Sequence, residues 1–256
     1  MRAGLTLFLI LWSGQALAVP VVSELDSNAA AALSVTTASI SITGMAVVFV
    51  DTHLLSTNTA TASVSGCGLT WSTVATSATF TALLGYHSYL YLLEGTGTST
   101  CTGGSLGTLT ITVTPTAGSG RLAYDVLNVT GYNTSTPVAQ SIATSSSYSG
   151  KSPSLSLTSP AATSATVGGF ATGSNLTAIS AGAGYTGSTN AQTGTAQTNY
   201  CNLRTEWQNT GVSTVDASST SSGNWGVIAV EIPQSGPVST SVLGGKSTIG
   251  GNSTIQ

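Results

Sequence analysis

The apolar residues of this chain fall into short runs from Val19 onward. The runs are rich in Val, Ile, Thr and aromatic residues, and each gives way to Gly, Ser, Asn or Pro, which is the pattern of β-strands separated by turns. No window keeps an apolar period of about 3.6 residues for the length of a substantial helix. We therefore predict two successive series of strands. The first series is Ser39–Val50, Ala60–Val64, Leu69–Ala75, Tyr86–Glu94, Gly107–Pro115 and Arg121–Val129. The second series is Ser154–Ser159, Ala165–Thr172, Thr195–Gln208, Val212–Ser218 and Asn224–Ile232.

Two kinds of strand differ in their polar pattern. The continuous apolar runs MAVVFV (45–50), VGGFAT (167–172) and WGVIAVEI (225–232) are typical of inner strands. By contrast, LTITVT (109–114) and STVDAS (213–218) alternate, as strands with one exposed face do. About eleven strands without intervening helices predict a single two-sheet antiparallel sandwich or a barrel.

Several segments also resemble a diffuse group of jelly-roll, concanavalin-A-like β-sandwich domains found in phage virion proteins, environmental viral sequences and secreted bacterial proteins. The segments are GLTWSTVAT, RLAYDVLNVTGYNTSTPVAQ, SPSLSLTSPAATSATVGGFAT, AGAGYT, RTEWQ and NWGVIAVEI, and they cover most of residues 35–232. The resemblance implies an all-β, jelly-roll sandwich. Its motifs mark strand order and turns, so it implies little about function.

The N-terminus has the layout of a secretory signal peptide. Arg2 precedes an apolar run at 5–12, and Ala16 and Ala18 form an A-x-A cleavage pattern. We expect cleavage before Val19 and export of the remaining chain. The apolar run is too short to span a bilayer, and no later run is longer, so we expect no membrane insertion after cleavage.

The C-terminal segment repeats a hexad, GGKSTI (244–249) and GGNSTI (250–255). A phosphate-binding loop would need a glycine at Thr240, five residues before Gly245, so the hexads do not form one. The hexads resemble tails of some phage structural proteins. We predict a signal peptide at 1–18, a β-sandwich domain at 19–233 and a Gly/Ser/Thr-rich tail at 234–256.

Charge excludes some partners. Only 5% of the residues are charged and the net charge is −3, whereas soluble domains have about 25% charged residues. The basic residues after the signal peptide are few and scattered: Arg121, Lys151, Arg204 and Lys246. Because a phosphate-binding surface needs clustered Lys and Arg, we expect no nucleic-acid partner.

Three cysteines in an exported chain suggest a disulfide. Cys67 and Cys101 both lie in glycine-rich turn sequence, on either side of two predicted strands. We predict that they pair and stabilise the fold by about 3 to 4 kcal/mol. Cys201 is then left as a buried free thiol, with intermolecular pairing as the alternative.

The sequence offers little catalytic or metal-binding chemistry. His53 and His87 are not spaced as zinc ligands, and no calcium-loop motif occurs. We expect no cofactor, with a calcium ion held by loop carbonyls and Asp51 or Asp125 as the alternative. The strand carboxylates do not form the E-x-D-x-x-E pattern of many jelly-roll glycanases, so we expect no enzyme. These carboxylates are Glu94, Asp125, Glu206, Asp216 and Glu231.

Binding is the better-supported activity. A strand at YHSYLYLLE puts His87, Tyr89 and Tyr91 on one face, where aromatic rings could stack on sugars. The alternative is that this row packs at the rim of the core with its hydroxyl groups at the edge. The neighbours Glu206 and Trp207 allow the same two interpretations.

Taken together, these features predict an exported, non-catalytic structural or binding module, secreted or on a cell or virion surface, that self-associates. Glycans are a second class of partner. The first alternative is a carbohydrate-binding module or adhesin, and the second is a glycoside hydrolase on a jelly-roll scaffold.

Overall fold

We describe the protein from a computed structural model. It describes residues 18–54, 58–81, 86–97, 101, 106–173, 178–193 and 201–236. Residues 1–17 of the predicted signal peptide and the C-terminal hexads lie outside these ranges. The described residues form strands and turns and contain no α-helix, and therefore none long and apolar enough to cross a membrane.

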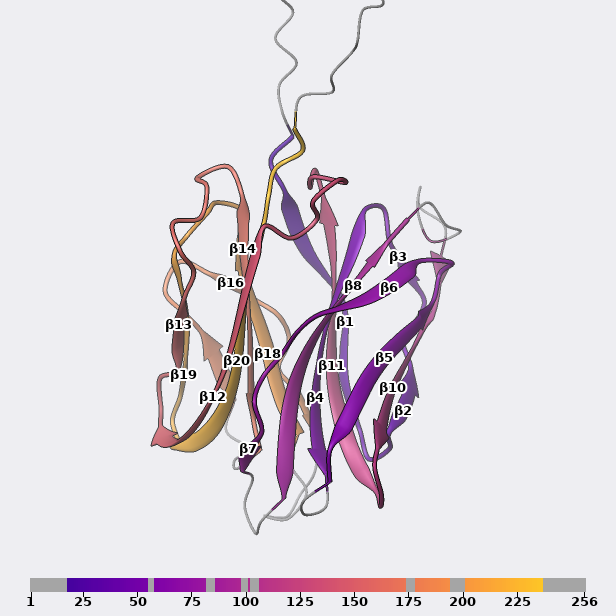
Figure 1. The fold of residues 1–256 in the computed structure, drawn as a ribbon, viewed down its shortest axis with the longest axis vertical. Coiled ribbons are helices and arrows are strands. Elements are labelled where there is room, and N and C mark those ends of the chain that lie inside the picture. Colours follow the sequence, from indigo (N-terminus) through magenta and orange to yellow (C-terminus); the bar gives the residue numbers. More distant parts are fainter. Residues whose placement is uncertain are drawn as a thin grey trace, which may run out of the picture.

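Four antiparallel sheets are stacked as layers (Figure 1). Inner sheet I has the order β1 (Val21–Ala30), β11 (Gly120–Thr130), β4 (Met45–Leu54), β8 (His87–Thr96) and β6 (Thr70–Thr76), with β7 (Phe80–Thr81) also paired to β8. Outer sheet I is β2 (Ser34–Thr36), β10 (Leu109–Pro115) and β5 (Ala60–Gly66). Inner sheet II is β12 (Gln140–Gly150), β20 (Gly223–Ile232), β14 (Ala165–Thr172), β18 (Cys201–Gln208) and β16 (Thr186–Gly187), with β17 (Ala191–Thr193) also paired to β18. Outer sheet II is β13 (Ser154–Ser156), β19 (Thr214–Ser219) and β15 (Ile179–Ala181). The short strands β3 (Ile40–Ser41) and β9 (Leu106–Gly107) form a separate pair.

The predicted all-β antiparallel sandwich architecture is confirmed, but the described strands form four main sheets where we expected two. Three hydrophobic cores fill the spaces between consecutive layers. The central core lies between the two inner sheets, and the other two lie between the inner and outer sheets of each half. Both inner sheets are therefore covered on both faces, and β4 and β14 are buried at every position. This burial explains the continuous apolar runs of the inner strands, while β10 and β19 alternate because one face is exposed.

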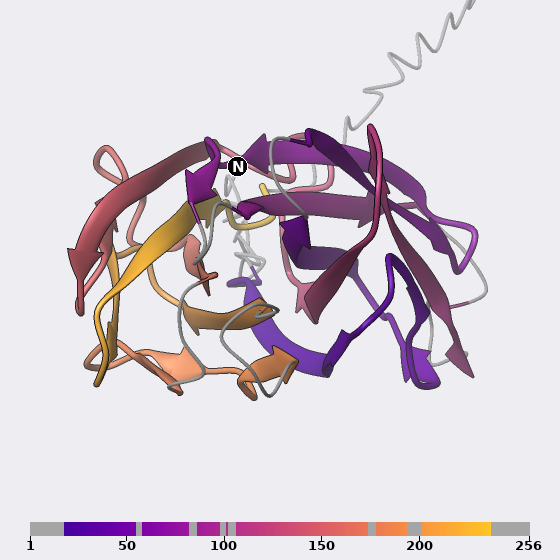
Figure 2. The ribbon, with the colours of Figure 1, turned by 90° about the horizontal axis from the view of Figure 1, so that it is seen from below.

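The second half of the molecule repeats the strand order of the first half. The order β1-β11-β4-β8-β6 recurs as β12-β20-β14-β18-β16, and β2-β10-β5 recurs as β13-β19-β15. Even the extra strand is repeated, because β7 pairs with β8 as β17 pairs with β18. Residues 21–130 and 140–232 are thus two structural repeats, seen side by side in Figure 2.

A polar contact that occurs once in each repeat allows the two repeats to be aligned residue by residue. Asn128 in β11 accepts hydrogen bonds from the backbone N–H groups of Thr43 and Gly44, just before β4. Glu231 in β20 accepts one from the N–H of Ala161 and one from the Ser164 hydroxyl, just before β14. The two side chains hold equivalent turns, so Asn128 and Glu231 are equivalent positions.

The repeats pack against each other reciprocally through their inner sheets. Strand β11 of the first repeat packs on β18 of the second, and β8 of the first packs on β20 of the second. Because β11 corresponds to β20 and β8 corresponds to β18, the two contacts are equivalent with the repeats exchanged. Such reciprocal contacts are those of an isologous interface between two copies. At its centre the Phe49 ring lies against Gly169, where a Cβ atom would be 2.2 Å from the ring. These two residues are equivalent by register, because Phe49 pairs with Asp125 and Gly169 pairs with Ile228, each three residues before the aligned polar residue.

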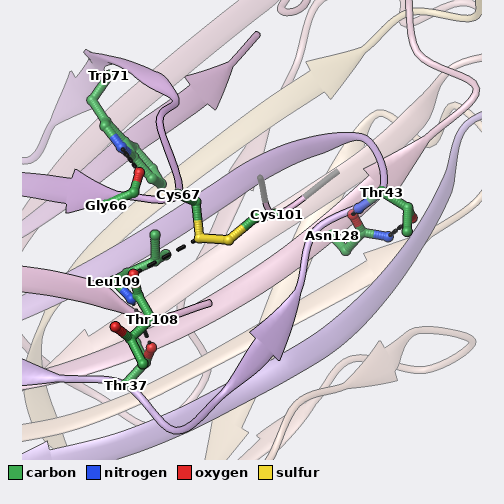
Figure 3. The surroundings of a disulfide bond; sticks show 9 residues. All are labelled: Thr37, Thr43, Gly66, Cys67, Trp71, Cys101, Thr108, Leu109 and Asn128. Atoms are coloured by element: carbon green, nitrogen blue, oxygen red, sulfur yellow. Dashed lines mark hydrogen bonds between the residues drawn. A yellow bond between two sulfur atoms is a disulfide. The ribbon is translucent and has the colours of Figure 1, made fainter. Parts of the chain in front are cut away.

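The predicted Cys67–Cys101 disulfide is confirmed, with a Cα–Cα distance of 5.0 Å (Figure 3). Cys67 lies in the turn that carries the chain from β5 to β6, at a positive φ of 54° between two glycines that also have positive φ. A Cβ atom on Gly107 would lie 2.3 Å from the sulfur of Cys101, so a glycine is required beside the disulfide. The bond ties outer sheet I and inner sheet I together at one end.

Candidate functional site

The predicted aromatic row lies inside the first half. His87, Tyr89 and Tyr91 share one face of β8, and this face points toward outer sheet I. The Tyr91 ring is only 4% exposed, and its hydroxyl donates to the carbonyl of Ala60 at 2.7 Å. The Tyr89 hydroxyl donates to the carbonyl of Asn58 at 3.5 Å, and the two tyrosine rings are 6.1 Å apart. The tyrosine bodies therefore pack in the core with their hydroxyl groups at its rim.

Glu206 and Trp207 point to opposite sides of inner sheet II. The carboxylate of Glu206 is buried and accepts hydrogen bonds from the backbone N–H groups of Gly182, at 2.6 Å, and Asp216, at 2.9 Å. Burial raises the pKa of Glu206 to about 7, although these two N–H groups act to lower it. Trp207 is 7% exposed and belongs to the central core. Glu206 thus joins β18 to β19 and to the residue that follows β15, both in outer sheet II.

Two other strand carboxylates also hold the fold together. In addition to its hydrogen bonds with the turn before β14, Glu231 accepts a hydrogen bond from the Gln140 amide at 2.6 Å. Burial acts to raise the pKa of Glu231, but its hydrogen bonds hold that pKa below the ordinary value. Glu94 accepts a hydrogen bond from the Ser72 hydroxyl at 3.1 Å. Each of these two carboxylates thus accepts a hydrogen bond from another element of the fold.

A buried polar cluster lies on one side of the interface between the repeats. The Asp125 carboxylate accepts a hydrogen bond from the Thr205 hydroxyl at 2.5 Å, and the Asp51 carboxylate accepts one from the backbone N–H of Asn202 at 3.2 Å. Both aspartates are fully buried, and one oxygen of each has no hydrogen-bond partner. Burial raises the pKa of Asp125 to about 7 and that of Asp51 well above its ordinary value.

The other side of the same interface is apolar. By the alignment of the repeats, Asp125 corresponds to Ile228, and Thr205 corresponds to Leu92. Ile228 and Leu92 are both core residues. The interface therefore combines the symmetry of its backbone with an asymmetric distribution of polar side chains.

Cys201 also belongs to this buried cluster. It is a free thiol with no exposed surface, as predicted, and its sulfur lies 4.0 Å from the carbonyl oxygen of Asp51. Burial and the charge of Asp51 raise the pKa of the thiol. His53 is 2% exposed on the same strand as Asp51. A thiol that is buried and protonated is a poor nucleophile.

The two aspartates considered as calcium ligands lie in strands and are enclosed by the second repeat. Among the residues described, no group of three or more His, Cys, Asp and Glu side chains is arranged to hold a metal ion.

The buried carboxylates make stability depend on pH. Asp125 has an ordinary pKa of 3.8 when unfolded and about 7 when folded, so the folded state binds more protons between these values. Stability therefore falls as pH rises from about 4 to about 7, on the order of 2–4 kcal/mol for Asp125, with Asp51 and Glu206 acting in the same direction. We expect lower urea midpoints at about pH 8 than at about pH 4.5, and a flatter dependence in Asp125→Asn. Asp216→Asn removes a charge that helps to raise the pKa of Glu206 but leaves Asp125 and Asp51 in place, so it should flatten the dependence less than Asp125→Asn does. A rise in midpoint with pH would contradict this expectation.

The exposed surface differs from these buried groups in its chemistry. On the outer face of outer sheet I, every outward-facing residue of the three strands is Ser or Thr. These residues are Ser34 and Thr36 on β2, Thr110, Thr112 and Thr114 on β10, and Thr61, Ser63 and Ser65 on β5. Neighbouring strands bring their hydroxyl groups into rows, and those of Ser34 and Thr112 are 3.0 Å apart. We call this surface the hydroxyl face.

Two small clefts open at sandwich edges. One, of about 150 Å³, lies between β5 and β6 beside Trp71. The other, of about 200 Å³, lies between β12 and β13 beside Trp225.

Comparisons with protein-family models, curated proteins and solved structures found no match.

The sequence contained a signal for the hydroxyl face that we did not use. Thr occupies every second position of LTITVT, and Thr61, Ser63 and Ser65 alternate in the same way on β5. That alternation predicts one polar face per strand, but only the pairing of β2, β10 and β5 joins the faces into one surface. The buried cluster had no comparable signal, because its members come from strands far apart in the chain.

Proposed function

We propose that this protein is an exported, non-catalytic structural module of a virion or cell surface and that it self-associates through the hydroxyl face. The observation that carries the proposal is the composition of that face, which has only Ser and Thr on its three strands. Short hydroxyl side chains lose little rotamer entropy when two surfaces meet, and each can both donate and accept a hydrogen bond. No charge on these strands has to be desolvated.

The buried carboxylates support the non-catalytic part of the proposal. Glu206, Glu231 and Asp125 each accept hydrogen bonds that connect strands or turns. Replacing Glu231, whose hydrogen bonds hold its pKa below the ordinary value, should therefore lower stability at neutral pH.

The proposal is tested by size-exclusion chromatography with light scattering on the chain from Val19 to Gln256. We expect the wild type to form oligomers whose mass grows with concentration. Thr110→Lys places a charge in the middle of the hydroxyl face, at an exposed position between Thr36 and Ser65, and should leave the fold intact and favour the monomer.

Ser218→Lys is the matched control, because it adds the same charge at an exposed position of outer sheet II. It should associate as the wild type does. A wild-type chain that stays monomeric at high concentration would overturn self-association, and equal association of both variants would exclude this face as the contact.

A further inference from the structure

The cleft between β12 and β13 has the features of a binding pocket. Its lining includes Trp225 and Val227, which also belong to the core between inner sheet II and outer sheet II. Pro153 and the hydroxyl-bearing residues Thr144, Ser152 and Ser154 also line it. The indole N–H of Trp225 donates to the carbonyl of Gly150 at 2.9 Å, which fixes the ring in place. An apolar floor with a few polar groups around it is the usual composition of a small-molecule site.

The first repeat shows how the same place is filled when it is closed. Tyr124 lies four residues before Asn128, and Val227 lies four residues before Glu231, so the two positions are equivalent. The Tyr124 ring is 1% exposed, and its hydroxyl donates to the Asp26 carboxylate at 2.9 Å. In the first repeat a ring with a hydroxyl group at its outer end thus fills the edge of the core.

The second repeat has other residues at the positions that fill this edge in the first. Val227 stands at the position of the tyrosine. Ile142 stands at the position of Asp26, because Ile142 pairs with Ala229 and Asp26 pairs with the equivalent residue Val126. Pro153 stands at the position of Leu33. The carbonyl of Pro153 accepts a hydrogen bond from the N–H of Ala217 in β19, just as the carbonyl of Leu33 accepts one from Val113 in β10. The pocket therefore lies at the positions that a tyrosine side chain and a leucine side chain occupy in the first repeat.

We propose that this pocket binds a neutral ligand whose ring has an apolar face and a hydroxyl-bearing edge, the chemistry of a sugar ring or of a phenolic ring. A volume of about 200 Å³ suits one such ring, since apolar cavities of about 150 Å³ accept benzene. Among the described residues that line the pocket none is charged, so a charged ligand would lose its hydration there without gaining a charged partner. The ligand lies where the second repeat has no counterpart of the Tyr124 ring, because Val227 holds that position. This site is independent of self-association.

The test is a titration followed by tryptophan fluorescence, to which Trp225 contributes, and by calorimetry, on the Thr110→Lys chain so that association does not interfere. The probes are a panel of methyl glycosides, phenol, and benzene as the ring without a hydroxyl group. We expect saturable binding of a glycoside or of phenol, and the arm that saturates identifies the source of the ring. Benzene that binds as tightly as every hydroxylated probe, or no saturation by any probe, would overturn the proposal.

Pro153→Leu tests the location, because it restores the residue of the first repeat and narrows the pocket. We expect affinity to fall at least tenfold with no loss of thermal stability. Thr144→Leu is a second variant that narrows the pocket from β12 if the proline cannot be replaced. Thr73→Leu, at the cleft beside Trp71, is the matched control and should bind as its parent does. Unchanged binding in both narrowed variants would place the ligand elsewhere and overturn the assignment.

Discussion

Phe49→Ala is expected to lower the free energy of unfolding by about 3–5 kcal/mol. The Phe49 side chain has no exposed surface and lies at the centre of the interface between the repeats, against Gly169. Its removal opens a cavity in a core that both inner sheets share, and neither backbone can move in to fill it without disturbing its own outer sheet. Urea unfolding at constant pH measures the loss as a lower midpoint. A loss below about 1 kcal/mol would contradict the placement of Phe49.

A double-mutant cycle isolates the contact between Phe49 and Gly169. Gly169→Ala places a Cβ atom 2.2 Å from the Phe49 ring, so it should destabilise the wild-type protein. In the Phe49→Ala background the ring is gone and the added methyl group has space. The second substitution should therefore cost much less there, with a coupling energy of about 1–3 kcal/mol. Additive effects of the two substitutions would contradict the direct contact.

Replacing Cys67 and Cys101 with serine is the second change with a large expected effect. The disulfide joins residues 34 apart, and closing a loop of this length stabilises a protein by about 4 kcal/mol through the lower entropy of the unfolded chain. The double variant should unfold at a much lower urea concentration than the wild type under non-reducing conditions. Cys201→Ala leaves the disulfide in place and is the comparison for a change at the remaining cysteine.

Reducing agent provides an independent measurement of the same effect. Dithiothreitol should lower the unfolding midpoint of the wild type toward that of the serine variant and leave that variant unchanged. The thiol of Cys201 should stay unreactive toward a thiol reagent until the protein unfolds, because it is fully buried. Equal midpoints with and without reducing agent would contradict a stabilising disulfide.

Strands that bury both faces were predictable from the sequence, whereas edge strands such as β1 and β12 were not. MAVVFV and WGVIAVEI predicted β4 and β20, which lie in the middle of the inner sheets. We missed β1, with the sequence VVSELDSNAA, and β12, with QSIATSSSYSG, which are equivalent edge strands of the two repeats. An edge strand pairs on one side only and forms through its backbone, so its side chains need not follow an apolar pattern.

The number of layers was also beyond the sequence. A continuous apolar run shows that a strand is covered on both faces, but not whether the cover is a second sheet or another half of the molecule. The structural repeat has little sequence signal, because equivalent positions such as Phe49 and Gly169 had to differ in size. Two phenylalanines could not both occupy the centre of the interface.

For the candidate site, the alternation of residues predicted that Tyr89 and Tyr91 share one face of their strand, but it could not specify what covers that face. The cover is outer sheet I with the segment at Asn58 and Ala60, which meets the tyrosines only in the folded chain. The hydrogen bond from Asn202 to Asp51 likewise joins residues 151 apart. Such contacts depend on how the sheets stack, which local patterns do not specify.

Sedimentation velocity of the chain from Val19 to Gln256, over a wide range of concentrations, tests the central claim most directly. The hydroxyl face predicts species larger than the monomer that increase with concentration and are lost in Thr110→Lys but not in Ser218→Lys. A single monomeric species at every concentration would contradict the claim that this protein is a self-associating structural module.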